Sequence, residues 1–156
     1  MKTARALVAV LLISSLISCS KDDDAAPSRL KHNGERWKIV SVDYNIVDQS
    51  LSNPMNWVKT GTAKDAGSFY FDGSKGSFDI LINDDRLEDY YGYTMDGSSV
   101  SIVTVEQSVS PSHFSQNVIA FSGDVDGTSM TISGTFTRQG GLSQYVFTGD
   151  FVLVKE

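Results

Sequence analysis

YVFTGDFVL, residues 145–153 of this 156-residue chain, carries the clearest indication of its fold. Its larger side chains fall on every second residue, with a glycine in the same phase: Tyr145, Phe147, Gly149, Phe151 and Leu153. Successive side chains of a β-strand point to opposite faces, so this pattern predicts a long strand with one buried face. No stretch of comparable length shows the 3.6-residue period of a helix.

Upstream of this strand, shorter patterns of the same kind predict seven more. They are centred on residues 37–44, 68–71, 78–82, 90–95, 100–105, 118–125 and 130–136. Asp96-Gly97 and Asp126-Gly127 are strong hairpin signals, and short connections join antiparallel neighbours. We therefore predict an all-β fold, an antiparallel up-and-down barrel of about eight strands, with a β-sandwich as the alternative.

Two segments do not fit this pattern. Residues 45–67 contain Asn53-Pro54 and several apolar side chains, which favours a short helix or a lid that packs onto one end of the barrel. Residues 106–116 are rich in serine and contain Pro111, which predicts a loop.

The first 19 residues indicate export and anchoring. Lys2 and Arg5 precede an apolar run over residues 6–13 that is too short to span a bilayer. Leu16-Ile17-Ser18-Cys19 resembles the bacterial lipobox, whose cysteine receives a diacylglycerol group and then an acyl chain such as palmitate. The resemblance implies a lipoprotein signal peptide over residues 1–18, lipid attachment at Cys19 and anchoring in the outer membrane.

Residues 19–33 form the next segment, a flexible acidic linker. Three aspartates, Asp22 to Asp24, are followed by alanine, proline and serine, a composition that cannot bury apolar area. A serine and an acidic run directly behind the lipidated cysteine resemble the surface-export signal of Bacteroidota lipoproteins, which implies display on the cell surface. Residues 34–156 then form one folded domain.

The charge of the chain excludes one class of partner. The formal net charge is −6, and removal of the signal peptide takes away Lys2 and Arg5. Such a chain cannot release the counterions of a nucleic acid, so we expect no nucleic-acid partner. Cys19 is the only cysteine, which leaves no internal disulfide. We expect a monomer.

The start of the domain carries a family resemblance. Residues 34–42, Gly-Glu-Arg-Trp-Lys-Ile-Val-Ser-Val, followed by the strand meander and preceded by the lipobox, resemble the lipocalin-like lipoproteins of Bacteroidota. The resemblance implies that Trp37 plugs the closed end of the barrel beneath a basic side chain. Lys155 is the candidate by position and Arg138 the second, through a cation–π contact.

A search for catalytic chemistry finds little. Neither His32 nor His113 has metal-ligand spacing, and both are expected on the solvated surface. No Gly-x-Ser-x-Gly motif is present, and the acidic cluster at residues 84–89 lacks the EF-hand spacing. We expect no enzymatic activity, no cofactor and no metal.

Aromatic side chains with polar groups are the remaining candidates for binding. Trp57, Tyr91 and Tyr93 suit a sugar or an amphipathic pocket, although alternating aromatics on a strand also form core. The function expected first is binding of a small apolar or amphipathic ligand by the lipocalin-like domain. The alternative is a non-enzymatic interaction module with a filled barrel that contacts a partner protein or a glycan.

Overall fold

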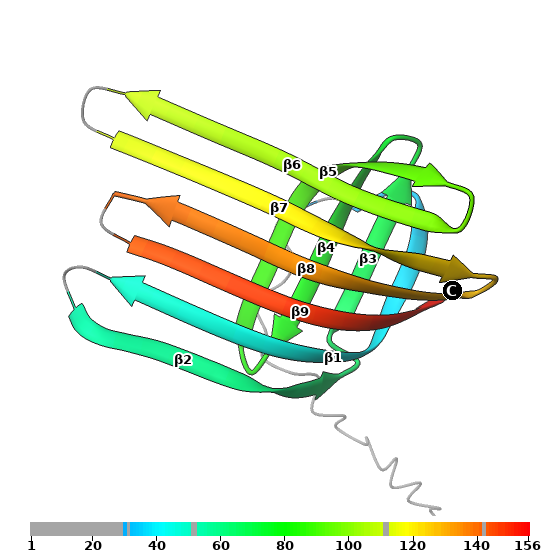
Figure 1. The fold of residues 1–156 in the computed structure, drawn as a ribbon, viewed down its shortest axis with the longest axis horizontal. Helices are drawn as coiled ribbons and strands as arrows, with labels where there is room; N and C mark the ends of the chain where they lie inside the picture. Colours follow the sequence, from blue (N-terminus) through cyan, green and yellow to red (C-terminus); the bar gives the residue numbers. More distant parts are fainter. Residues whose placement is uncertain (1–29, 31, 51–52, 111–112, 142) are drawn as a thin grey trace, which may run out of the picture.

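The computed structural model describes residues 30, 32–50, 53–110, 113–141 and 143–156. The described residues form strands connected by tight turns (Figure 1). The strands are β1 (Glu35–Ser50), β2 (Asn53–Lys64), β3 (Gly67–Asp72), β4 (Lys75–Ile82), β5 (Asp85–Asp96), β6 (Ser99–Ser110), β7 (His113–Asp126), β8 (Ser129–Gly140) and β9 (Ser143–Lys155).

All nine strands belong to one antiparallel sheet that closes in a ring. Hydrogen bonds join them in the order β2-β1-β3-β4-β5-β6-β7-β8-β9, and β1 also pairs with β9. The 16-residue strand β1 makes this closure because it is long enough for three partners. Its residues 35–38 pair with β3 and residues 41–50 pair with β2 on one edge, while residues 37–50 pair with β9 on the other.

The all-β, antiparallel prediction is confirmed, and so are both hairpins. Asp96 pairs with Ser99 and Asp126 pairs with Ser129 across the two predicted turns. The strand count was too low by one, because the described residues of segment 45–67 are neither a helix nor a lid. They hold the end of β1, all of β2 and the first residue of β3. The predicted loop 106–116 was also wrong, because β6 continues to Ser110 and β7 begins at His113.

Two breaks divide the ring into a closed half and an open half. After β2, Asp65 adopts a φ of 52° and Gly67 a φ of 108°, which redirects the chain into β3. A side chain at Gly67 would lie 2.0 Å from the carbonyl oxygen of Asp79, so only glycine fits there. On the other side, β5 pairs with β6 only through Tyr93–Asp96.

In the closed half, β3, β4 and β5 lie behind the long strands and cover their inner face (Figure 1). The open half consists of residues 47–50, 53–58, 105–110, 113–118, 137–140 and 143–146, in six strands that extend beyond this cover. The same long strands therefore run from a two-layered region into a single layer.

The interior of the closed half is filled by aromatic and aliphatic side chains. Phe69 is fully buried, and its ring centroid lies 5.3–6.1 Å from those of Phe78, Tyr91, Phe121 and Phe151. The described hydrophobic core runs from Trp37 to Leu153, and residues 20–156 therefore retain all of it.

Candidate functional site

A row of polar and aromatic side chains crosses the inner face of the open half. Strand pairing aligns one residue from each of six strands, and we call this set the rim row: Trp57, Asp48, Tyr145, Arg138, Asn117 and Glu106. The row next to it, toward the closed half, is largely apolar: Lys59, Ile46, Phe147, Phe136, Ile119 and Thr104. The rim row thus marks where the inner face changes from core to polar surface.

One end of the rim row lies in a cleft of about 310 Å³. Trp57 from β2, Tyr145 from β9 and Asp48 from β1 line it, together with the ion pair Lys59–Asp85. Trp57 keeps 59% of its surface exposed. The Lys59 Nζ donates to the Asp85 carboxylate over 2.6 Å, and this hydrogen bond raises the pKa of Lys59.

Tyr145 contributes a polar group to this cleft that the described residues do not satisfy. Its hydroxyl is buried and has no hydrogen-bond partner among them. Burial, followed by the charges of Asp85 and Asp48, raises the pKa of Tyr145, so the hydroxyl stays protonated at neutral pH. A buried group of this kind gains free energy from any ligand that pairs with it.

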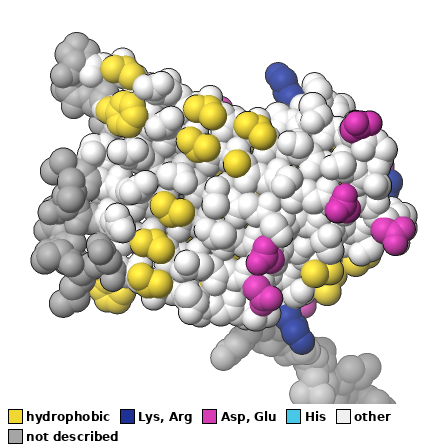
Figure 2. All heavy atoms as spheres, viewed as in Figure 1, with side chains coloured by type: hydrophobic (Ala, Val, Ile, Leu, Met, Phe, Trp, Pro, Cys, Tyr) yellow, Lys and Arg dark blue, Asp and Glu magenta, His cyan; other side chains and the backbone are white. Residues whose placement is uncertain are grey.

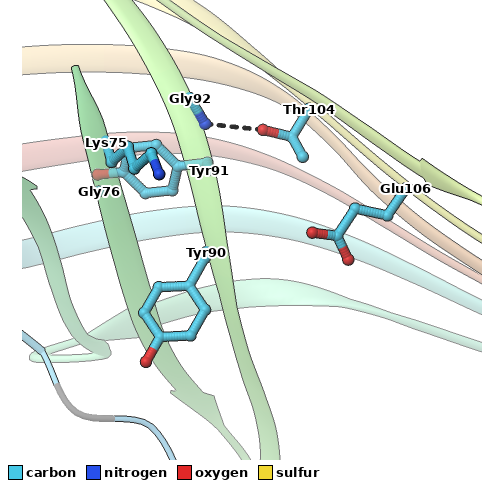
Figure 3. A pocket seen from close by; sticks show the side chains of 7 residues that line it. All are labelled: Lys75, Gly76, Tyr90, Tyr91, Gly92, Thr104 and Glu106. Atoms are coloured by element: carbon cyan, nitrogen blue, oxygen red, sulfur yellow. Dashed lines mark hydrogen bonds between the residues drawn. The ribbon is translucent and has the colours of Figure 1, made fainter.

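The other end of the row lies in a second cleft, of about 400 Å³, where β5 and β6 separate (Figure 3). Here the Gly92 N–H donates to the Thr104 hydroxyl over 2.8 Å. Tyr90 and Tyr91 line the β5 side, and Glu106 reaches toward them from β6. The cleft follows from the end of the β5–β6 ladder at Tyr93.

Opposite charges lie at the middle of the rim row, with Arg138 in the row and Asp89 on β5 facing it. The Arg138 guanidinium lies 5.2 Å from the centroid of the Phe136 ring. The Asp89 carboxylate of β5 accepts from the Tyr90 N–H over 2.9 Å and from the Asn117 side-chain amide over 3.4 Å. Burial raises the pKa of Asp89, against the opposing effects of the Tyr90 N–H and of Arg138.

Of the three aromatic residues predicted to bind a ligand, Tyr91 and Tyr93 lie together, with ring centroids 6.2 Å apart, whereas Trp57 lies apart from both. Trp57 lines the first cleft, Tyr91 the second, and Tyr93 a third hollow of about 340 Å³ beside Ser101 and Val103. Tyr91 is 2% exposed and donates its hydroxyl to the Tyr70 carbonyl oxygen over 2.9 Å, as part of the core. Only Trp57 presents a large aromatic surface to solvent on the inner face.

The two residues expected at the closed end lie side by side. Trp37 is 2% exposed and pairs across the β1–β9 ladder with Lys155, whose Nζ lies 6.0 Å from the Trp37 ring centroid. Lys155 also donates to the Glu35 carboxylate over 2.6 Å, which lowers the pKa of Glu35. Arg138, the second candidate, lies in the open half instead.

The remaining sequence predictions concern the N-terminal segments, His32 and the acidic cluster at residues 84–89. Cys19, the signal peptide and linker residues 19–29 and 31 lie outside the described residues. His32 is not a freely solvated side chain as expected, because it stacks on Tyr70 with centroids 4.5 Å apart and hydrogen-bonds to Ser77 over 2.8 Å. Within the acidic cluster, Arg86 is bound by Asp79 over 2.6 Å.

Sequence reasoning missed most of the rim row. Asp48, Asn117 and Glu106 lie in or next to the segments read as irregular, and Tyr145 was read as core. Trp57 was singled out by its residue type, and Arg138 only as the second candidate for the contact with Trp37. The row depends on the register between six strands, which no local pattern contains.

Searches of the described residues for two other features were negative. They contain no group of three His, Cys, Asp or Glu side chains that could hold a metal ion. No helix in this part of the chain is long and apolar enough to cross a membrane. Comparisons with protein-family models, with curated proteins and with solved structures found no match for this chain.

Proposed function

We propose that this protein is a lipocalin-like lipoprotein, anchored in the outer membrane through Cys19 and displayed on the cell surface, that binds a glycan along the rim row. The observation that carries the binding proposal is the exposed Trp57 in the same cleft as the unpartnered Tyr145 hydroxyl. The protein is a binding module in this proposal.

The packing of the ring supports a site at the rim. The inner positions of the closed half are occupied by buried side chains, five of them phenylalanines with less than 2% exposure: Phe69, Phe78, Phe136, Phe147 and Phe151. A ligand inside the ring would have to displace these rings, whereas one at the rim contacts side chains that are already exposed.

The chemistry of the row supports a glycan over a purely apolar ligand. The flat Trp57 side chain can stack on the apolar face of a sugar ring. Asp48, Arg138 and Glu106 are exposed and supply hydrogen-bond acceptors and donors along the row. Sugar hydroxyls both donate and accept, so they match a row in which both kinds of group alternate.

Fluorescence titration of residues 20–156 with short neutral oligosaccharides (glucan, xylan, mannan and chitin fragments) tests the binding proposal. Trp37 is buried and Trp57 is exposed, so a ligand at the rim changes the emission of Trp57. We expect Trp57→Ala to weaken binding about tenfold or more, which corresponds to roughly 1.4 kcal/mol.

Val58→Ala is the matched control, because Val58 is equally exposed on the same strand but points to the opposite face. It is expected to bind like the unaltered protein. A panel without any binding at millimolar concentration, or equal affinity of the Trp57→Ala variant, overturns the binding proposal.

Anchoring is tested separately on the full chain in a Gram-negative host. Metabolic labelling with an alkyne analogue of palmitate should mark the full chain and not its Cys19→Ser variant. Protease added to intact cells should degrade a surface-displayed domain. Protection of the labelled protein from that protease would contradict surface display and leave the anchor in place.

A further inference from the structure

The outer face of the open half carries a feature that glycan binding does not use. Strand pairing aligns a row of β-branched side chains across all six strands, Val58, Val47, Val146, Thr137, Val118 and Val105. The row beside it is made of glutamines, Gln49, Gln144, Gln139, Gln116 and Gln107. We call these two rows, with the next row toward the closed half, Thr60, Asn45, Thr148, Thr135, Ala120 and Val103, the valine face.

The valine face is exposed on its two edge strands, partly buried at most positions on its four central strands, and apolar in part. Val58, Val105 and Val103 each keep 59–60% of their surface exposed. Figure 2 shows hydrophobic side chains spread across this part of the molecule. Single exposed valines are ordinary, whereas a contiguous row over six strands is typical of an interaction surface.

Charge is absent from the valine face although the whole chain carries a net charge of −6. None of the side chains in its three rows is ionisable. The acidic residues that point to the same side, Asp43, Asp150, Asp124, Asp126 and Asp96, lie farther along the strands in the closed half. Two acidic copies can therefore approach through the valine face without burying a charge or placing like charges in contact.

Two of the three rows, the β-branched row and the glutamine row, each hold side chains of similar size, which makes the valine face complementary to itself. Side chains of one height form a flat surface, and two flat sheets pack face to face about 10 Å apart. Glutamine amides both donate and accept, so the glutamine row of one copy can pair with that of a copy related by a twofold axis. A membrane surface is a poorer match, because the face contains no Lys, Arg, Trp or Tyr side chain.

The area of the valine face is close to the minimum that a specific interface buries. Six strands about 4.8 Å apart and three rows about 7 Å apart give a surface of roughly 25 by 20 Å. Two such faces bury about 1,000 Å² together, which is near the lower limit for specific association. We propose that the protein forms a twofold-symmetric dimer through the valine face, in place of the monomer expected from the sequence.

Sedimentation equilibrium of residues 20–156, from micromolar to millimolar concentration, tests the proposal. The unaltered protein should show a monomer–dimer equilibrium. Val146→Lys, at the centre of the face, should raise the dimer dissociation constant at least tenfold. Val154→Lys is the control, because Val154 points outward from the same strand and adds the same charge in the closed half.

A second variant guards against misfolding at the centre of the sheet. Val105→Lys changes an exposed side chain at the edge of the face and should weaken the dimer as well. A monomer at millimolar concentration overturns the proposal, and so does a dimer that both variants leave intact. A second measurement is flotation with vesicles of phosphatidylethanolamine and phosphatidylglycerol. If the unaltered protein floats with the vesicles and the Val146→Lys variant does not, the face binds membranes and the dimer proposal is overturned.

Discussion

The closed half and the open half are built from the same long strands, yet their inner positions hold different chemistry. Along β9, the inner side chains change from Phe151 and Phe147 in the covered region to Tyr145 at the rim. Along β8, they change from the buried Phe136 to the exposed Arg138. The change coincides with the end of the cover that β3, β4 and β5 provide.

Alternation in the sequence determines which side chains share a face of the sheet, and a second layer determines whether that face is buried or exposed. Where two layers meet, inner side chains stabilise the fold by burial. Where one layer continues alone, both faces are exposed and their side chains are available for contacts. Substitutions in the closed half should therefore change stability, and those in the open half should change binding or association.

The largest effect is expected from Phe69→Ala in the closed half. It removes a fully buried ring that contacts four others, and should lower the free energy of unfolding by about 3–5 kcal/mol. Urea denaturation of residues 20–156 measures this. Trp57→Ala in the open half should stay within about 0.5 kcal/mol of the unaltered protein. Similar losses for both variants would show that the two halves contribute alike to stability.

A smaller loss is expected from Gly123→Ala. A side chain at Gly123 would lie 1.8 Å from the Thr131 carbonyl oxygen on β8, so the two strands must separate locally. The expected cost is about 1–3 kcal/mol, measured by the same denaturation. Gly92→Ala is the control, because its nearest atom would be 3.7 Å away. An unchanged free energy of unfolding for Gly123→Ala would show that β7 and β8 can separate here without loss of stability.

Asp89, which faces the rim row, provides a pH-dependent test. Burial raises the pKa of Asp89 in the folded state, so folding favours the protonated carboxyl. The free energy of unfolding is therefore higher at low pH and decreases as the pH rises through that pKa. Asp89→Asn should be more stable than the unaltered protein at pH 7, within about 1 kcal/mol because the carboxylate is only half-buried, and equal to it near pH 3. Urea denaturation at both pH values checks this.

Asp96→Asn is the control for that experiment, because Asp96 lies on an exposed hairpin and should show no such difference. If Asp89→Asn is instead less stable at pH 7, attraction between Asp89 and Arg138 outweighs the cost of burial.

The smallest effect is expected from Lys155→Met beside Trp37. Lys155 contacts the Trp37 ring and pairs with Glu35 near solvent, so its loss should cost less than about 1 kcal/mol. The pKa of Glu35 should rise, because the Lys155 hydrogen bond is the main cause of its lowering. NMR titration of Glu35 and urea denaturation measure the two effects. An unchanged Glu35 pKa would contradict the pairing.

The sequence predicted the closed half better than the open half, for a physical reason. In β9 and in the strands around Phe78 and Ile102, one face is buried and the other is not, which leaves an alternating pattern. In β2 both faces are exposed, Trp57 on one side and Val58 on the other, so no alternation marks it as a strand. Both the rim row and the valine face depend on cross-strand register, which only the paired sheet supplies.

The 16-residue strand β1 also determines how the domain would respond to force. With a tether at Cys19, tension between the membrane and a ligand at the rim would pull along β1 and load its hydrogen bonds to β2 and β9 together. Tension between the two chain ends would instead separate Arg36 from Glu156 first and then peel the β1–β9 ladder pair by pair from Trp37 and Lys155 onward. An anchor at Cys19 would thus set the direction in which the sheet resists mechanical strain.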